Sequence, residues 1–203
     1  MGPANNSVKT LVDLLDAGMS VARVNFTNSH ENREELKNLR EAMVSRPDRQ
    51  YAILLDLQGP MNAMNSDISP LTGQAITEVK EEFANPALKH QVDFIVTAPK
   101  VKNSKDLQLI KKSLGKEGGT KIFAKIDNEV AYRNFEMIMD WSDGIVISGD
   151  ELVCDEIPAE KVPIAQKYMI EKANKAGKPV ITAIQVFDSK TEEGARASAS
   201  DVV

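Results

Sequence analysis

The stretch Lys121–Asp150, KIFAKIDNEVAYRNFEMIMDWSDGIVISGD, predicts a strand, a helix and a second strand. The first strand is a short apolar run that ends in Lys125 and Asp127, and the second is an Ile/Val run that ends in Asp150. A strand–helix–strand unit with a short crossover makes its two strands parallel, so their carboxyl ends face the same way. We therefore expect one cationic and two acidic side chains to meet at the edge where α/β folds place their chemistry.

The same alternation of strands and helices extends over the rest of the chain. Short apolar runs give six strand signals, at 21–26, 51–57, 93–98, 121–127, 144–150 and 179–185. Helical patterns separate them, at 8–17, 27–45, 76–88, 106–114, 130–139 and 159–176. The sequence therefore predicts one α/β domain over residues 1–203, with a parallel sheet covered by helices.

Composition excludes several classes of protein. Hydrophobic residues make up 42% and charged residues 27% of the 203 residues, which is ordinary for a globular domain. The net charge of −5 and the lack of a basic block argue against a nucleic-acid or anionic-membrane surface. The single cysteine, Cys154, excludes an internal disulfide framework and suits a reducing compartment. With no signal-peptide pattern and no membrane-length apolar run, we expect a cytoplasmic protein.

Several segments together resemble the pyruvate kinase family. In the family's order, and over almost the whole chain, they are VARVNFTNSH (21–30), LLDLQGP (54–60), KIFAKIDN (121–128), SDGIVISGD (142–150) and EIPAEKVPIAQKYMIEKANKAGKPVITAIQ (156–185). The resemblance implies a (β/α)₈ barrel in which the first and last strands are missing. It also implies that a short linker at 59–78 replaces the family's lid domain and that the carboxyl-terminal regulatory domain is absent.

The resemblance assigns roles to residues at the strand ends. Lys125 matches the lysine that neutralises the transferring phosphoryl group, and Arg23, Gly149 and Asp150 match positions that bind substrate. The residues matching the Mg²⁺ ligands are Asp127 and Asp150, and those matching the K⁺ ligands are Asn25, Thr27, Asp56 and Leu57. The family has glutamate at the position of Asp127, so this carboxylate has a shorter reach.

Each of these positions also has a structural interpretation. A lysine that ends a strand is usually a solvated cap, and Asp127 or Asp150 could cap the helix that follows its strand. Asn25 and Asp56 could serve turns after their strands, although a buried Asp56 without a partner would be costly.

Other positions depart from the family. Ile184 replaces a threonine implicated in protonating the enolate, Asn28 replaces a histidine, Gln58 a lysine and Ser148 an arginine. The loop GDELVCDEIP is two residues longer than the family's pattern, and its acidic residues Asp150, Glu151, Asp155 and Glu156 are expected to repel anionic substrates. Cys154 lies in this loop with no matched imidazole partner, so we interpret it as a plain thiol.

Three functions remain open on these residues. The favoured interpretation is a degenerate relative with a structural or protein-binding role and at most weak divalent-metal binding through Asp150. The alternatives are an active pyruvate kinase that transfers phosphoryl from phosphoenolpyruvate to ADP in glycolysis, and a phosphometabolite or metal binder without turnover. Six strands of an eight-stranded barrel leave open edges at VARVNF and PVITAIQ, so we also expect another protein chain, a second copy or a different protein, to cover them.

Overall fold

Six parallel strands form one curled sheet, and their order across the sheet is their order along the chain. The structure, a computed structural model, describes residues 5–26, 29–57, 92–97, 101–114, 119–152 and 157–183. The strands are β1 Val21–Phe26, β2 Ala52–Leu57, β3 Phe94–Val96, β4 Lys121–Ile126, β5 Gly144–Ser148 and β6 Val180–Ala183. The predicted half-barrel of six parallel strands is confirmed.

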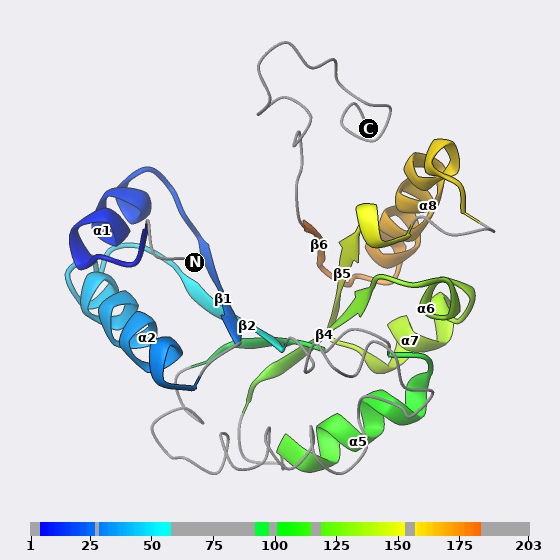
Figure 1. Cartoon of the computed structure of the whole chain (residues 1–203), viewed down its shortest axis with the longest axis horizontal. Helices are drawn as coiled ribbons and strands as arrows, with labels where there is room; N and C mark the ends of the chain where they lie inside the picture. Colours follow the sequence, from blue (N-terminus) through cyan, green and yellow to red (C-terminus); the bar gives the residue numbers. More distant parts are fainter. Residues whose placement is uncertain are drawn as a thin grey trace.

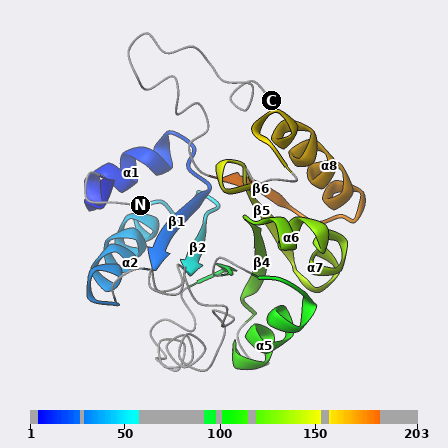
Figure 2. The ribbon, with the colours of Figure 1, turned by 45° about the vertical axis from the view of Figure 1, so that its right-hand side comes forward.

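Helices lie on the outer side of the curled sheet (Figures 1 and 2). They are α1 Val8–Asp16, α2 Ser29–Val44, α5 Ser104–Leu114, α6 Glu129–Arg133, α7 Phe135–Trp141 and α8 Val162–Lys175. Short 3₁₀ turns, η3 Asp150–Leu152 and η4 Ala159–Lys161, lie between β5 and α8 along the chain. None of the helices in the described ranges is long and apolar enough to cross a membrane.

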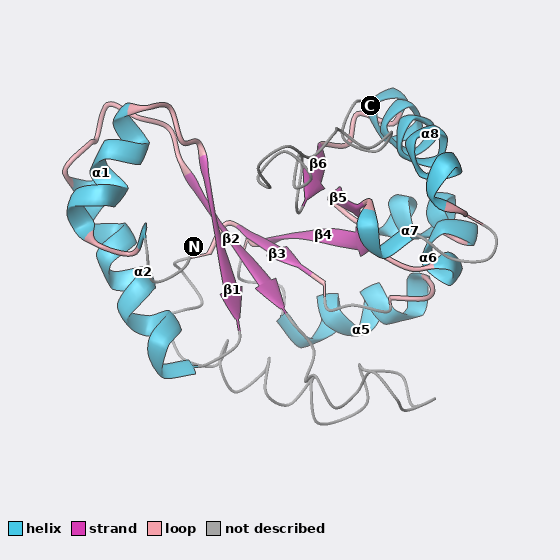
Figure 3. Cartoon of the chain, turned by 45° about the horizontal axis from the view of Figure 1, so that its top comes forward, coloured by secondary structure: helices cyan, strands magenta, loops and turns pink. Residues whose placement is uncertain are grey.

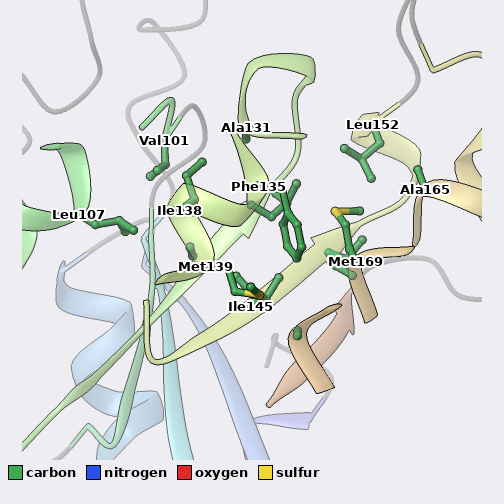
Figure 4. Packing of buried hydrophobic residues seen from close by; sticks show 14 of the residues in the cluster. Val101, Leu107, Ala131, Phe135, Ile138, Met139, Ile145, Leu152, Ala165 and Met169 are labelled. Carbon is green, nitrogen blue, oxygen red and sulfur yellow. The ribbon is translucent and has the colours of Figure 1, made fainter. Parts of the chain in front are cut away.

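The largest core lies between the sheet and the helices. In β4, Ile122, Ala124 and Ile126 face this core, because alternate strand residues point to the same side. Phe135 of α7, Ile145 of β5 and Met169 of α8 meet there (Figure 4), with Phe135 only 1% exposed. A second outer core joins α1 and α2 to the amino-terminal strands; its largest members include Leu11, Leu15, Leu36, Leu39, Met43 and Ile53. Both cores pack helices against the sheet.

The inner face of the sheet carries a smaller apolar cluster. Its members are Leu54, Val96, Phe123, Val146 and Ala183, with Phe94 and Ile181 packed against them. The Phe123 ring lies against Gly144 of the next strand, where an added Cβ would stand 2.6 Å from the ring. Glycine at position 144 is therefore needed because the aromatic ring occupies the space of a side chain.

Hydrogen bonds from side chains mark several helix boundaries. The Ser7 hydroxyl accepts from the Thr10 N–H at 3.2 Å and begins α1. The helix predicted over 130–139 is instead two short helices that meet at Asn134, whose side-chain amide donates to the Lys102 carbonyl at 2.8 Å. At the end of α7, Lys178 Nζ donates to the carbonyls of Met139, Asp140 and Ser142 and ties β6 to this helix.

Figure 3 shows β1 and β6 at the two ends of the curled sheet. Within the described residues, β1 pairs with β2 alone and β6 with β5 alone. The predicted helix at 76–88 and linker at 59–78 lie outside the described residues. The structure therefore shows the two sheet edges and leaves the domain organisation around the linker as a prediction.

Candidate functional site at the carboxyl ends of the strands

Charged side chains gather where the parallel strands end. Asp56 and Lys125 lie near the ends of β2 and β4, Asp127 directly after β4, and Glu151 just after β5, while Arg23 reaches Asp56 from the middle of β1. Asp56 and Lys125 each follow an inner-face residue by two positions, Leu54 and Phe123, so both point to the inner face of the sheet. Parallel topology therefore brings together groups that are far apart along the chain.

Lys125 is the centre of the more buried group. Its side chain is 6% exposed, and its Nζ lies 2.8 Å from Glu151 Oε2 and 3.7 Å from Asp127 Oδ2. Its backbone N–H donates to the Thr97 hydroxyl at 3.0 Å, and this contact fixes β4 against the end of β3. Lys125 is thus a buried, ion-paired cation, and its interpretation as a solvated strand cap is wrong.

Asp127 lies beside Lys125, as the sequence predicts. Its side chain is 3% exposed, and its Oδ1 accepts from the Asn128 side-chain amide at 2.7 Å. The N-cap of α6 is Asn128, whose Oδ1 accepts from the Ala131 N–H at 2.9 Å. The cap that the sequence left open for Asp127 therefore belongs to its neighbour, while Asp127 contributes negative charge next to Lys125.

Arg23 and Asp56 form an ion pair with each other. Arg23 Nε donates to Asp56 Oδ2 at 2.8 Å, and Arg23 Nη2 donates to the same oxygen. The Asp56 side chain is 3% exposed and the Arg23 side chain 32% exposed. Sequence reasoning gave these residues separate roles, in phosphate and K⁺ binding, and missed the pair. The available signal was a strand-end carboxylate on an inward-facing position, which needs a cationic partner when it is buried.

The segment after β5 has two further features. Ser148 is fully buried, and its hydroxyl has no hydrogen-bond partner among the residues the structure describes. Gly149 is covered by the side-chain amide of Gln166 from α8, so a Cβ at position 149 would require the Gln166 side chain to move. Gln166 was not identified from the sequence, because its place over the loop depends on how α8 packs.

The residues around Lys125 do not by themselves make a metal site. No group of three or more His, Cys, Asp or Glu residues in the described part of the chain is arranged to hold a metal ion. Asp127 and Glu151 both lie near the Lys125 ammonium, and Asp56 is bound to Arg23. These carboxylates form ion pairs with cationic side chains, so as placed they fit neither a Mg²⁺ site nor a K⁺ site.

Several positions identified from the sequence cannot be placed in this site. The structure describes only the backbone of Asn25, Leu57 and Asp150, and Asp150 begins the turn η3 directly after β5. The remaining positions lie outside the described residues; they are Thr27, Asn28, Gln58, Cys154, Asp155, Glu156 and Ile184. Their roles remain predictions.

The described site is close to electrically balanced. One ammonium faces two carboxylates, and one guanidinium faces one carboxylate. Because both cations already have partners from this chain, an anion from solution would have to compete with carboxylates held close by. The arrangement favours a closed ionic network over an open anion-binding surface.

Comparison with known proteins gives a consistent result. The family model described as the pyruvate kinase barrel domain matches residues 1–66 and 61–203. A pyruvate kinase of Eimeria tenella is 31% identical over 291 residues, and a human pyruvate kinase is 30% identical over 300. These alignments cover 100% of this chain but 55% and 52% of the relatives, so the chain spans about half the length of the curated relatives it matches.

A solved structure agrees with the sequence comparisons. The fold matches that of a Cryptosporidium parvum pyruvate kinase in complex with ADP, with a TM-score of 0.81 and 26% sequence identity. The match covers 99% of this chain and 58% of that one. Members of this family generally use Mg²⁺ and K⁺. Since the barrel-domain model and the relatives both match along the whole chain, and the strands follow the same fold, the chain belongs to the pyruvate kinase family.

Proposed function

We propose that this chain is a degenerate member of the family, which keeps the half-barrel for a structural or protein-binding role and does not turn over phosphoenolpyruvate and ADP. The observation that carries the proposal is the 2.8 Å contact between Lys125 Nζ and Glu151 Oε2. In this position the resemblance places the lysine that neutralises a transferring phosphoryl group. Here the same ammonium is neutralised by a carboxylate of the chain itself.

The charge balance supports the proposal. Phosphoryl transfer depends on positioning and on neutralising negative charge, so the cations at the strand ends must be free to meet the substrate. Lys125 has two carboxylates within 4 Å, and Arg23 is bound to Asp56. Close like charges repel by about 1 kcal/mol or more in a surface environment, so a bound phosphate would be opposed by Asp127 and Glu151. On this basis the family's Mg²⁺ and K⁺ sites are vestigial here.

A coupled assay tests this function directly. The purified chain is incubated with phosphoenolpyruvate, ADP, Mg²⁺ and K⁺, and pyruvate formation is followed with an intact family member as the positive control. We expect turnover several orders of magnitude below the usual enzyme range of about 1–10³ s⁻¹. A kcat inside that range would refute the proposal and establish the active kinase in its place.

The sheet edges supply the protein-binding part of the proposal, and we propose a second copy of this chain as the partner. β1 and β6 are parallel and lie at opposite ends of the sheet, so β6 of one copy can extend its ladder onto β1 of another in the same strand direction. Val21 on β1 is 42% exposed and Thr182 on β6 is also exposed. The compartment we propose is the cytoplasm, which suits a lone Cys154.

Light scattering at micromolar concentration tests the association, and Val21→Lys is the informative variant. Lysine on an edge strand opposes pairing with another chain, and the exposed Val21 side chain is not needed for the core. We expect the wild-type chain to show a mass above that of a monomer and Val21→Lys to lower it. The control Val44→Lys adds the same charge at a 77% exposed position of α2 and is expected to leave the mass unchanged. A stable, cooperatively melting wild-type monomer would contradict this interface.

A further inference from the structure

The contact between Lys125 and Glu151 is asymmetric in its exposure to solvent. The Lys125 side chain is 6% exposed, whereas that of Glu151 is 46% exposed. Lys125 extends from the middle strand β4 and is held by its surroundings, while Glu151 belongs to the three-residue turn η3 after β5. A change of side-chain rotamer is enough to return the glutamate to water, but the lysine cannot follow it.

Ser148 provides a second, independent feature on the neighbouring strand β5. The register pairs Lys125 with Val146, and Ser148 lies two residues further along β5 on the same inner face. Its side chain is 0% exposed, and its hydroxyl has no hydrogen-bond partner among the described residues. A buried hydroxyl of this kind requires an explanation, and a ligand oxygen that is not part of the protein is one such explanation.

We propose that Lys125 Nζ and Ser148 Oγ form a binding site for a small oxyanion. The carboxylate of Glu151, an anion tethered to the chain, occupies this site. When Glu151 turns out to solvent, the ammonium and the hydroxyl together bind a tetrahedral oxyanion such as inorganic phosphate or a phosphate monoester, and Asp127, whose Oδ2 stays 3.7 Å from the ammonium, limits the strength of this binding. This inference rests on the proposed function, because it explains how the chain closes its own phosphate position. It adds that the closure is reversible and resides in one side chain.

The competition follows ordinary linkage. A carboxylate held on a short tether acts as a competitor at millimolar or higher effective concentration. If Glu151 occupies the binding site about nine-tenths of the time, the apparent affinity for a free anion falls about tenfold, equal to about 1.4 kcal/mol. A substitution that removes the charge of Glu151 but keeps its shape should raise the apparent anion affinity by the same factor. A substitution of Ser148 should change this affinity only when Glu151 has left the site.

The test is titration of the full chain with inorganic phosphate, followed by ³¹P NMR line broadening and by calorimetry at constant ionic strength. We expect Glu151→Gln to bind phosphate at least about tenfold more tightly than the wild-type chain. The matched control is Glu171→Gln, which removes one glutamate charge from the exposed pair with Lys175 on α8 and should bind like the wild type. Glu151→Gln combined with Ser148→Ala should lose most of the gain, and combined with Lys125→Gln all of it.

The outcomes separate this inference from the proposed function. Equal phosphate affinity in the wild type and Glu151→Gln would overturn the tethered anion, even if the chain is inactive as an enzyme. If the higher phosphate affinity of Glu151→Gln is kept when Ser148→Ala is added, Ser148 does not bind the anion. If Glu171→Gln also binds phosphate more tightly than the wild type, the effect is one of general charge and the proposed site is overturned. Turnover by the wild-type chain would refute the proposed function by a separate measurement. A melting curve for each variant confirms that it is folded.

Discussion

The ion pair between Arg23 and Asp56 predicts an asymmetric response to mutation. We consider Arg23→Met, which removes the cation, and Asp56→Asn, which removes the negative charge but keeps the shape and one acceptor oxygen. Asp56 is 3% exposed and Arg23 is 32% exposed, so the two variants leave very different groups behind. The first leaves a buried carboxylate without its charged partner, and the second leaves a cation that reaches water.

The magnitudes follow from burial. Removing one partner of a buried ion pair costs about 3–5 kcal/mol, since the remaining charge cannot be solvated. We expect Arg23→Met to reach this range, because Asp56 is enclosed. Asp56→Asn should cost about 1–2 kcal/mol, because the amide oxygen can still accept a hydrogen bond and the guanidinium is partly solvated. The double variant should be more stable than Arg23→Met alone, since it has no stranded charge.

Urea denaturation followed by circular dichroism measures these differences, with the m-value checked for each variant. The control is Arg46→Met, which breaks an exposed two-point pair in which Arg46 Nε lies 2.7 Å from Asp16 Oδ1 and Arg46 Nη2 lies 2.8 Å from Asp16 Oδ2. The hydrogen-bond geometry of this pair is at least as good as that of Arg23 and Asp56. If Arg46→Met lowers the free energy of unfolding much less than Arg23→Met, burial decides the size of the effect. Equal losses in Arg23→Met and Asp56→Asn, or losses no larger than in the control, would refute the reasoning.

Three further predictions concern packing, pH and metal. Gly144→Ala should lower the free energy of unfolding by about 1–3 kcal/mol, because its Cβ would stand 2.6 Å from the Phe123 ring. Adding Phe123→Leu to this variant should recover part of the loss. An unchanged urea midpoint in Gly144→Ala would contradict the packing argument. The hydrogen bond from Lys172, followed by that from Tyr168, lowers the pKa of Glu136. Its stabilising effect is therefore present above the ordinary glutamate pKa of about 4.3 and is lost as pH falls through the lower folded value, so the difference in urea midpoint between wild type and Glu136→Gln should shrink between about pH 7 and pH 3. Titration with Mn²⁺ should show at most weak binding, and Asp150→Ala should weaken it further. If this substitution leaves Mn²⁺ binding unchanged, Asp150 is not a metal ligand.

The sequence was sufficient to predict the architecture. The strand signal at 51–57 corresponds to β2 at Ala52–Leu57, and the signal at 21–26 coincides with β1 at Val21–Phe26. Buried strands of a parallel sheet are continuous apolar runs, and this pattern is local along the chain. The split of the central helix at Asn134 was not predictable in the same way, because it accompanies a side-chain contact with Lys102 that is distant in sequence.

The candidate site was predictable only in part. The convergence of Lys125 and Asp127 followed from their spacing at the end of one strand, and the structure places them 3.7 Å apart. The Glu151 contact could not be predicted, because it depends on the conformation of a turn and on a long side chain. The sequence indicated a general repulsion of anions by the acidic loop, whereas the structure shows one of its carboxylates directly on the lysine.

The strand order of the sheet has a consequence for how the molecule opens. Among the described residues, each strand is hydrogen-bonded only to its immediate neighbours along the chain, so this sheet is a linear array of β-units, as in repeat proteins. In such an array, separation of an end strand leaves the ladder between the middle strands intact, and each end can open without the other. Amide hydrogen exchange should therefore be graded, slowest in β3 and β4 and faster toward β1 and β6. The two sheet edges are the places where this fold comes apart first.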